Sequence, residues 1–382
     1  MNRSANVRAE KGRLIRMGNV KINALQMFCL IVLFALGTAL VVSYGAEAKR
    51  DAWLAILLCG PVGGSLIFMI YSCLHRLYPN LSFVLYTQQI VGKWIGWLLG
   101  VVFIIYFLHE AARDLRDYGD LLTVSMFTET PLFMVHVMMI LTLIYVLYLG
   151  IEVLGRLAEI SVVIILGLGI IATISVLLSG KADINQLFPI LEHGLKGMVS
   201  QSFPSLFVIP WGEMSAFTLI LPHLNNPRSV MRTGLSAILF SVVVLSFTIL
   251  LNISVLGVDV FTRSNFALLE TIRRVSLMEF IERLDPIVLL TLIIGDFFKV
   301  GIFFYATVIG ASDLFKVKNH KTLILPVGII ILLASLTVAG NFAEHIKIGG
   351  GLLPLYAHIP ISVIIPLLLL IVALIRKHFR TS

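Results

Sequence analysis

The sequence predicts an all-α, polytopic membrane protein with about ten transmembrane helices. Of its 382 residues, 58% are hydrophobic and 13% are charged, and the mean hydropathy is +0.98. A chain of this composition cannot hide its apolar surface from water as a globule. Apolar runs of about 20 residues, the length that crosses a bilayer, recur along it: residues 22–44, 52–74, 95–124, 131–150, 158–179, 202–221, 235–256, 287–311, 323–341 and 355–375.

The chain divides into one membrane domain, residues 22–376, and two short basic tails. Residues 1–21 lead into an apolar run that is too long for a signal-peptide core and has no small-residue cleavage site, so we expect the first span to be retained. An even number of spans returns residues 377–382 to the same side, where Lys and Arg predominate in the loops. The positive-inside rule then predicts that both tails are cytoplasmic. The net charge of +8 indicates contact with anionic lipid rather than nucleic acid, because the basic residues form no aromatic-interleaved patch.

The sixth apolar run carries the strongest indication of function. It is broken at its centre by Pro210 and Gly212, and one carboxylate, Glu213, follows the break. In hydrocarbon, unwound backbone and ionisable side chains are tolerated only where they line protein or a watery cavity. The sequence therefore predicts a solute site at the middle of the membrane.

The first run has a second interruption, where small residues replace bulky ones at positions 36–40. Close helix packing through small residues would explain it alone. If the spans form two halves of five, however, the first and sixth runs hold corresponding places, and paired interruptions of this kind indicate a transporter-type binding site. Broken helices expose N–H groups that favour a carboxylate and carbonyls that favour an ammonium, which together suit an amino acid zwitterion.

The third run ends in a segment that carries both signs of charge at helical spacing. If it continues as a helix, Glu110, Arg113, Asp114 and Asp117 share one face, and we expect that face to line an aqueous vestibule. An exposed loop is the alternative.

The eighth run contains Asp296 and Lys299, three residues apart and so on one helical face inside the bilayer. They form either a structural ion pair or a functional pair in which Lys299 replaces a coupling cation or contacts ligand.

No enzyme motif is present in the sequence. It lacks a phosphate-binding Gly-rich loop, a nucleophile elbow and an HExxH motif, so we predict neither catalysis nor a cofactor. His193, His223, His345 and His358 fall in predicted loops without metal-ligand spacing, and the sequence predicts no metal site and no role for them.

Several short strings occur in the order typical of one family: LGTAL at 36–40, DAW at 51–53, TETP at 128–131, GIEVLGRLAEI at 150–160, FPILEHG at 188–194, PWGEMSAFTLILP at 210–222, IERLDP at 281–286 and FFKVGIFFY at 297–305. From about residue 22 to its end, the chain resembles the B subunit of spore germinant receptors, the spore germination permease branch of the amino acid-polyamine-organocation superfamily. The resemblance implies ten helices in a LeuT-like 5+5 inverted repeat with broken helices 1 and 6. It also implies residence in the spore inner membrane beside an A subunit and a lipoprotein C subunit, and small-molecule germinants that are commonly amino acids.

The resemblance also implies roles for individual residues. Gly37 and Thr38 fall on the break of the first helix, Glu213 on the acid after the sixth-helix break, and Lys299 on the lysine of the eighth helix. Tyr106, Asp114 and Arg116 match third-helix positions that face the pathway. Trp211 stands where Phe is more usual before Gly-Glu, which puts the shape of the pocket and the identity of the ligand in doubt.

The sequence thus predicts a nutrient-binding sensor in which no bond is made or broken. Ligand would bind between helices 1, 3, 6 and 8 and shift the protein toward a signalling conformer. The alternatives are a proton-coupled amino acid transporter, in which Glu213, Asp296 and Lys299 exchange protons, and a component of a water or ion pore.

Overall fold

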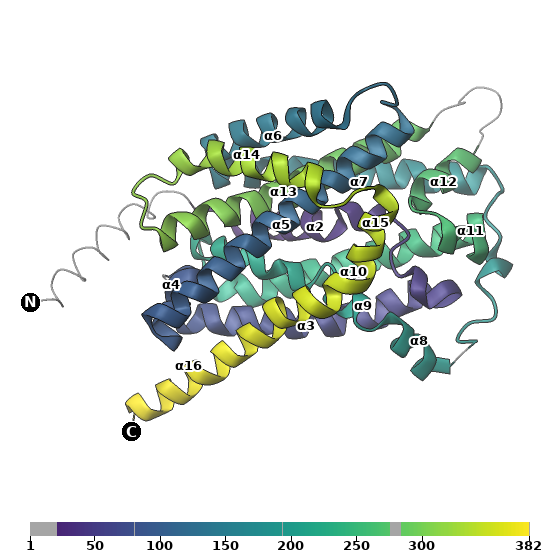
Figure 1. Ribbon diagram of the computed structural model, residues 1–382. Helices are drawn as coiled ribbons and strands as arrows, with labels where there is room; N and C mark the ends of the chain where they lie inside the picture. The colour runs from purple at the N-terminus through teal and green to yellow at the C-terminus, as the bar shows by residue number, and fades with distance from the viewer. Residues whose placement is uncertain (1–20, 80, 193, 276–283, 382) are drawn as a thin grey trace, which may run out of the picture.

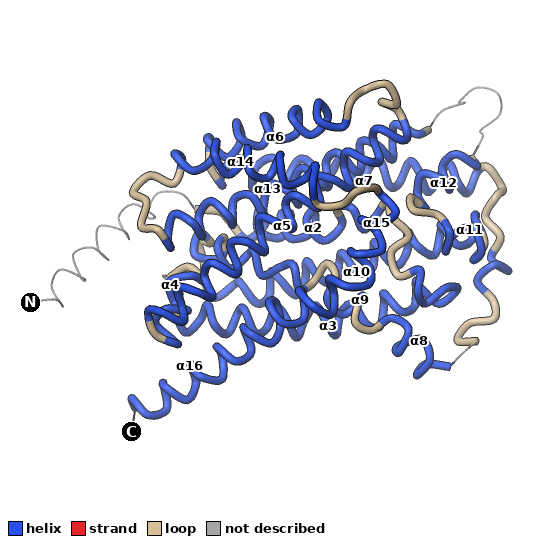
Figure 2. Tube along the Cα trace, in the orientation of Figure 1, coloured by secondary structure: helices blue, strands red, loops and turns tan. Residues whose placement is uncertain are grey.

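The computed structural model describes residues 21–79, 81–192, 194–275 and 284–381. The predicted N-terminal tail up to residue 20, His193 and residues 281–283 of the IERLDP string lie outside them. Within the described residues the chain is helical, and its one β contact is an isolated bridge between Ile22 and Leu224, so the predicted all-α class is confirmed (Figure 1; Figure 2).

Eight helical segments of the described chain are long and apolar enough to cross a membrane, rather than about ten. Seven of them contain α3 (Ala52–Leu77), α5 (Lys93–Ser125), α6 (Leu132–Leu149), α7 (Ile151–Leu178), α10 (Val230–Leu256), α13 (Asp285–Leu314) and α14 (Lys321–Thr337). The eighth joins a π-helical stretch, η8 (Pro354–Ile364), to α16 (Ile365–Thr381). The remaining two predicted runs, 22–44 and 202–221, are the interrupted ones, which explains the difference in number.

The long helices form one bundle, and short helices cap it. α13 is the most buried of the eight spans and packs chiefly on α5. α10 packs on α3 and on α2 (Ala24–Leu36), the helix of the first interrupted run. The short helices α8 (Gly194–Ser202), α11 (Val258–Arg263) and α12 (Ala267–Arg274) gather at one end of the bundle, away from the C-terminus of α16 (Figure 1). α4 (Phe83–Val91) joins α3 to α5 at the other end, and α15 (Phe342–Lys347) with η7 (Ile348–Leu352) precedes η8.

The first segment is a helix that stops in the middle of the apolar run. α2 (Ala24–Leu36) begins with a reciprocal cap, in which the Asn23 side chain accepts from the Gln26 N–H and the Gln26 side chain accepts from the Asn23 N–H. It ends at Gly37, which packs directly on α13: a Cβ on Gly295 would lie 2.8 Å from the Gly37 Cα. One short turn, η1 (Thr38–Leu40), follows, and the chain is then irregular to η2 (Ala46–Asp51).

The second interrupted segment owes its break to proline. α9 (Ser205–Val208) ends because Ile209, which precedes Pro210, adopts the extended backbone that a following proline imposes. Pro210 also lacks the N–H that would continue the helix. The chain resumes a tight 3₁₀ helix, η4 (Gly212–Leu219), and a further turn, η5 (Leu221–His223), so the break leaves unwound backbone on either side of Pro210.

The two interrupted segments are joined at two places. At the start of the first segment, Ile22 N–H donates to the His223 carbonyl at 3.0 Å, and Asn225 N–H donates to the Ile22 carbonyl at 3.0 Å. At the end of the first segment, the Tyr44 hydroxyl donates to the Ile209 carbonyl, which lies at the break of the second segment and outside any helix. The two breaks therefore face one another across a common space.

Candidate functional site

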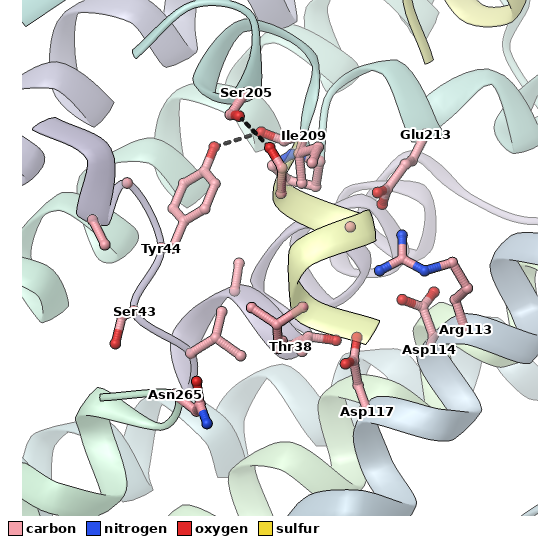
Figure 3. Close-up of a pocket in the computed structure, with 18 of the residues that line it drawn as sticks. Thr38, Ser43, Tyr44, Arg113, Asp114, Asp117, Ser205, Ile209, Glu213 and Asn265 are labelled. Carbon is pink, nitrogen blue, oxygen red and sulfur yellow. Dashed lines mark hydrogen bonds between the residues drawn. The ribbon is translucent and has the colours of Figure 1, made fainter. Parts of the chain in front are cut away.

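A cavity of about 270 Å³ lies between the two interruptions. The unwound stretch after α2 supplies one wall and the segment around Pro210 another, and α5, α13, η7 and the loop after α11 complete the lining. In Figure 3, Glu213, Arg113, Asp114 and Asp117 follow one another along one side of the cavity, and Tyr44, Ser43 and Asn265 lie on the other.

The charged face of α5 is turned toward this cavity. Glu110, Arg113, Asp114 and Asp117 all line it, because the helix continues without a break through the whole predicted third run. The predicted helix is therefore confirmed and the exposed-loop alternative is wrong. Arg113 approaches the backbone of η7 so closely that a Cβ on Gly349 would lie 2.2 Å from its Nη2. Its Nε is buried and has no hydrogen-bond partner in the described part of the chain.

Lys299 connects three elements at the base of the cavity. Its ammonium lies 2.9 Å from Asp114 Oδ1 on α5 and 3.0 Å from Glu213 Oε2 on η4, and all three side chains are at least nine-tenths buried. The contact with Asp114 has hydrogen-bond geometry, whereas the contact with Glu213 is an ion-pair distance without it. One ammonium thus stands between two largely buried carboxylates, where removal of any of the three would leave a buried charge without its partner.

Asp296 bonds to the first segment instead of to Lys299. Its Oδ1 accepts from the Thr38 hydroxyl at 2.7 Å, and its side chain is fully buried. A structural ion pair between Asp296 and Lys299 within α13 is therefore not what the structure contains. Asp296 instead binds the turn after Gly37, and Lys299 pairs with the carboxylates of α5 and η4.

The predicted site residues divide into two groups. Those that line the cavity are Thr38, Glu110, Arg113, Asp114, Asp117, Pro210, Glu213 and Lys299. Those that do not are Gly37, Tyr106, Arg116, Trp211, Gly212 and Asp296.

The second group supports the first or belongs to the packing around it. Trp211 is fully buried against α3, where a Cβ on Gly64 would lie 3.1 Å from its indole ring. Arg116 turns along α5 and pairs with Asp120 at 2.7 Å. Gly212 fits beneath Val208, whose Cγ1 would lie 2.7 Å from an added Cβ. The sequence led us to expect that Trp211 reshapes the ligand pocket, but Trp211 is not among the residues that line the cavity.

Two of the histidines to which the sequence assigned no role lie beside the site. His345, in α15, approaches Asp117 with its Nε2 2.8 Å from Oδ1. His358, in η8, is fully buried, and its Nδ1 lies 2.6 Å from the Tyr106 hydroxyl. The expectation that these residues lie in loops is wrong, because the sequence around them is helical. No spacing signal could have found them, since their partners are more than 200 residues away.

His223, the third histidine of the described chain in that group, is also in a helical turn. Its Nε2 lies 3.0 Å from the Tyr305 hydroxyl on α13, close to the backbone link between Ile22 and the sixth segment. It therefore belongs to the packing between that segment and α13 and lies outside the cavity lining.

Comparison with known proteins gives the chain its family. Residues 21–343 match the model of a family described as spore germination protein. The chain is 39% identical over 364 residues to spore germination protein KB of Bacillus subtilis (strain 168), which covers 95% of this chain and 97% of that protein. It is 26% identical over 345 residues to spore germination protein YndE of the same organism, a match that covers 86% of this chain and 88% of that protein. It is 24% identical over 327 residues to spore germination protein A2, also of that organism, which covers 83% of this chain and 87% of that protein.

The match extends over both interrupted segments, the charged face of α5 and Lys299. The family consists of germination receptor and permease membrane proteins rather than known enzymes. The resemblance predicted from the sequence is confirmed, and the protein belongs to the spore germination protein family as a multi-span membrane protein of the B-subunit type.

Proposed function

We propose that this chain is the nutrient-binding membrane subunit of a spore germination receptor, and that it senses a small molecule, most simply an amino acid. The observation that carries this proposal is the cavity enclosed by the two interrupted segments. Unwound backbone within a membrane is tolerated only where it is buried in protein or lines a cavity, and here it offers N–H and carbonyl groups that a ligand can use.

Size and charge support an amino acid. The volume of about 270 Å³ is below the roughly 300 Å³ at which pockets for drug-sized molecules begin. The carboxylates of Asp117 and Glu110 suit an ammonium group, and the guanidinium of Arg113, with its Nε unpartnered in the described chain, suits a carboxylate. A zwitterion therefore finds both charges matched within one short space.

Sensing requires only that the ligand prefers one conformer of the protein. A ligand in the cavity touches the first segment, the sixth segment and α5 at once, and Lys299 already joins the last two to α13. Closing or opening of these elements around the ligand would change which carboxylate holds Lys299. The pairing of Lys299 with one carboxylate or the other would give two states, and a bound ligand could favour one of them. The packed helices could then transmit the change away from the cavity.

The resemblance supports the remaining parts of the proposal. We expect the chain to reside in the spore inner membrane with both termini in the cytoplasm, to contact membrane lipid, and to operate with an A subunit and a lipoprotein C subunit. The LeuT-like 5+5 repeat belongs to the same proposal, in which the two interrupted segments would hold corresponding places in the two halves.

Glu213→Gln is the direct test of the site. The change keeps shape and hydrogen-bonding capacity but removes the charge beside the break, so the germinant concentration for half-maximal response should rise roughly 5–150-fold, the usual range for coupling between sites. Germination of spores that carry the variant, at matched membrane level, measures it. Glu129→Gln, in an exposed loop, is the control and should respond as wild type. An unchanged dose response in Glu213→Gln would remove Glu213 from the site.

Liposomes separate the proposed sensor from the proton-coupled transporter. A transporter must release its ligand on the other side, whereas a sensor need not, so purified protein should bind labelled germinant without accumulating it under an imposed pH gradient. Gradient-driven uptake that is lost in Asp296→Asn and retained in Glu129→Gln would establish the transporter and overturn the sensor.

A further inference from the structure

We propose that Glu110, Glu213 and His358 form a binding site for one divalent transition-metal cation. The three side chains come from α5, η4 and η8, and one possible ligand atom from each lies within 4.8 Å of the other two. Their exposed fractions are 2%, 3% and 0%. Glu213 lies 3.0 Å from Lys299 and Glu110 lies 3.3 Å from His109 Nδ1, and a cation between the two buried carboxylates would add to this compensation.

The histidine is held as a metal ligand requires. Its Nδ1 is engaged by the Tyr106 hydroxyl at 2.6 Å, and the Ser362 hydroxyl donates to the same Tyr106 oxygen at 3.3 Å. Its Nε2 is buried and has no hydrogen-bond partner among the residues that the structure describes. A metal-bound imidazole typically donates the N–H of its other ring nitrogen to an acceptor; in the tautomer that binds an ion, Nδ1–H donates to the Tyr106 hydroxyl and leaves Nε2 for the ion.

The fold gives this histidine an unusual setting. η8 is a π-helical stretch with proline at both Pro354 and Pro360. π-Helical turns are rare, and they are found frequently at functional sites. Here the stretch packs against η4 and brings His358 beside the carboxylate that follows the sixth-segment break.

The surrounding charges favour a cation. The cavity lining contains two basic side chains, Arg113 and Lys299, and five carboxylates: Glu47, Glu110, Asp114, Asp117 and Glu213. Glu110 and Glu213 face this cavity, so an ion has a route to them, while His358 lies behind them. Glu213 also keeps its ion-pair distance to Lys299, and a carboxylate with two oxygens can serve both partners.

The donor set indicates the class of ion. One imidazole nitrogen and two carboxylate oxygens suit Zn²⁺, Mn²⁺ or Co²⁺, with bonds of about 2.0–2.2 Å. Oxygen-only ligation, which Ca²⁺ and Mg²⁺ prefer, would leave His358 without a function. The ammonium group of a bound nutrient is the competing occupant. We favour the metal because an imidazole nitrogen of His358 converges with the two carboxylates, and an imidazole nitrogen can coordinate a metal ion directly.

Metal titration of the full chain tests the proposal. The protein is purified in detergent, its affinity tag is removed, and it is stripped with a chelator. Zn²⁺ is then titrated by calorimetry, and Co²⁺ is titrated by visible absorption, which reports ligand type and geometry. We expect one ion per chain, a Co²⁺ spectrum with imidazole character, and a rise in the midpoint of thermal unfolding when Zn²⁺ is added.

Two pairs of variants assign the ligands. Glu110→Gln and His358→Gln should each weaken Zn²⁺ binding at least ten-fold and abolish the Zn²⁺-dependent rise in the unfolding midpoint. Glu129→Gln and His320→Gln, which change the same residue types outside the cluster, should behave as wild type. A variant that fails to fold is recognised by a lowered or absent unfolding midpoint in the presence of chelator. In that case the Co²⁺ spectrum of the other variant decides whether the cluster binds the metal.

Three results would overturn the proposal. They are the absence of Zn²⁺ and Co²⁺ binding to the stripped wild-type protein, binding that His358→Gln leaves unchanged, and binding of a simple alkylammonium ion at this cluster in preference to metal. The first two results leave the proposed nutrient sensing standing, because germination measures it separately, and the third would support it, since Glu110 and Glu213 also line the proposed nutrient cavity.

Discussion

Lys299→Met should abolish the nutrient response and strongly reduce the amount of folded protein in the membrane. The ammonium is buried between Asp114 and Glu213, at 2.9 Å and 3.0 Å. Removing it leaves two carboxylates close together without a counter-ion, and breaking a buried charge pair in this way costs about 3–5 kcal/mol. That is a large fraction of the roughly 5–15 kcal/mol by which proteins are stable. Thermal unfolding in detergent, membrane abundance and spore germination measure the three consequences.

A charge-neutral triple variant separates stability from signalling. Combining Lys299→Met with Asp114→Asn and Glu213→Gln removes every formal charge of the cluster, so stability should recover while the response stays absent. Lys181→Met makes the same substitution at an exposed position and is the matched control. Wild-type stability and dose response in Lys299→Met alone would show that the cluster carries neither stability nor signal.

Gly295→Val should uncouple the first-segment break from α13. A Cβ at this position would lie 2.8 Å from the Gly37 Cα, a contact that real Cβ atoms do not show, and backbone rather than a flexible side chain would have to give way. Overpacking of this kind costs about 1–3 kcal/mol. The displaced turn should also lengthen the 2.7 Å bond from Thr38 to Asp296, and we expect at least a ten-fold loss of sensitivity to germinant.

Gly167→Val provides the comparison for this variant. Gly167 is also in a spanning helix, α7, but nothing lies within 4 Å of an added Cβ, so the same substitution should be neutral there. Germination dose responses and unfolding midpoints are measured for both. Equal behaviour of the two variants would mean that the close approach of Gly295 to Gly37 has no part in function.

The breaks could be predicted because their causes are local. Pro210 removes a backbone donor and holds Ile209 extended, and these effects need no knowledge of the rest of the chain. The charged face of α5 is equally local, since Glu110, Asp114 and Asp117 share a face by helical spacing alone. Helix spacing and chain composition were therefore enough to predict the spans, the interruptions and one wall of the cavity.

The partners of Lys299 could not be predicted in this way. Spacing within one helix offers only Asp296, which lies on the same face, whereas the observed partner Asp114 is 185 positions away in sequence. His358 and Tyr106 are separated by 252 positions. These contacts depend on how helices that are distant in the sequence pack together, and the apolar run that contains His358 gives no sign that this stretch is π-helical.

The double connection between the two interrupted segments limits how this protein can move. Backbone hydrogen bonds fix Ile22 to the end of the sixth segment, and the Tyr44 hydroxyl fixes the far side of the first segment to Ile209. Because these hydrogen bonds tie the two segments to one another at two places, we expect the segments to move together. Thr38 and Gly37 also tie the first segment to α13, so we expect rearrangement around a ligand to occur chiefly between these elements and α5, where the ammonium of Lys299 binds Asp114.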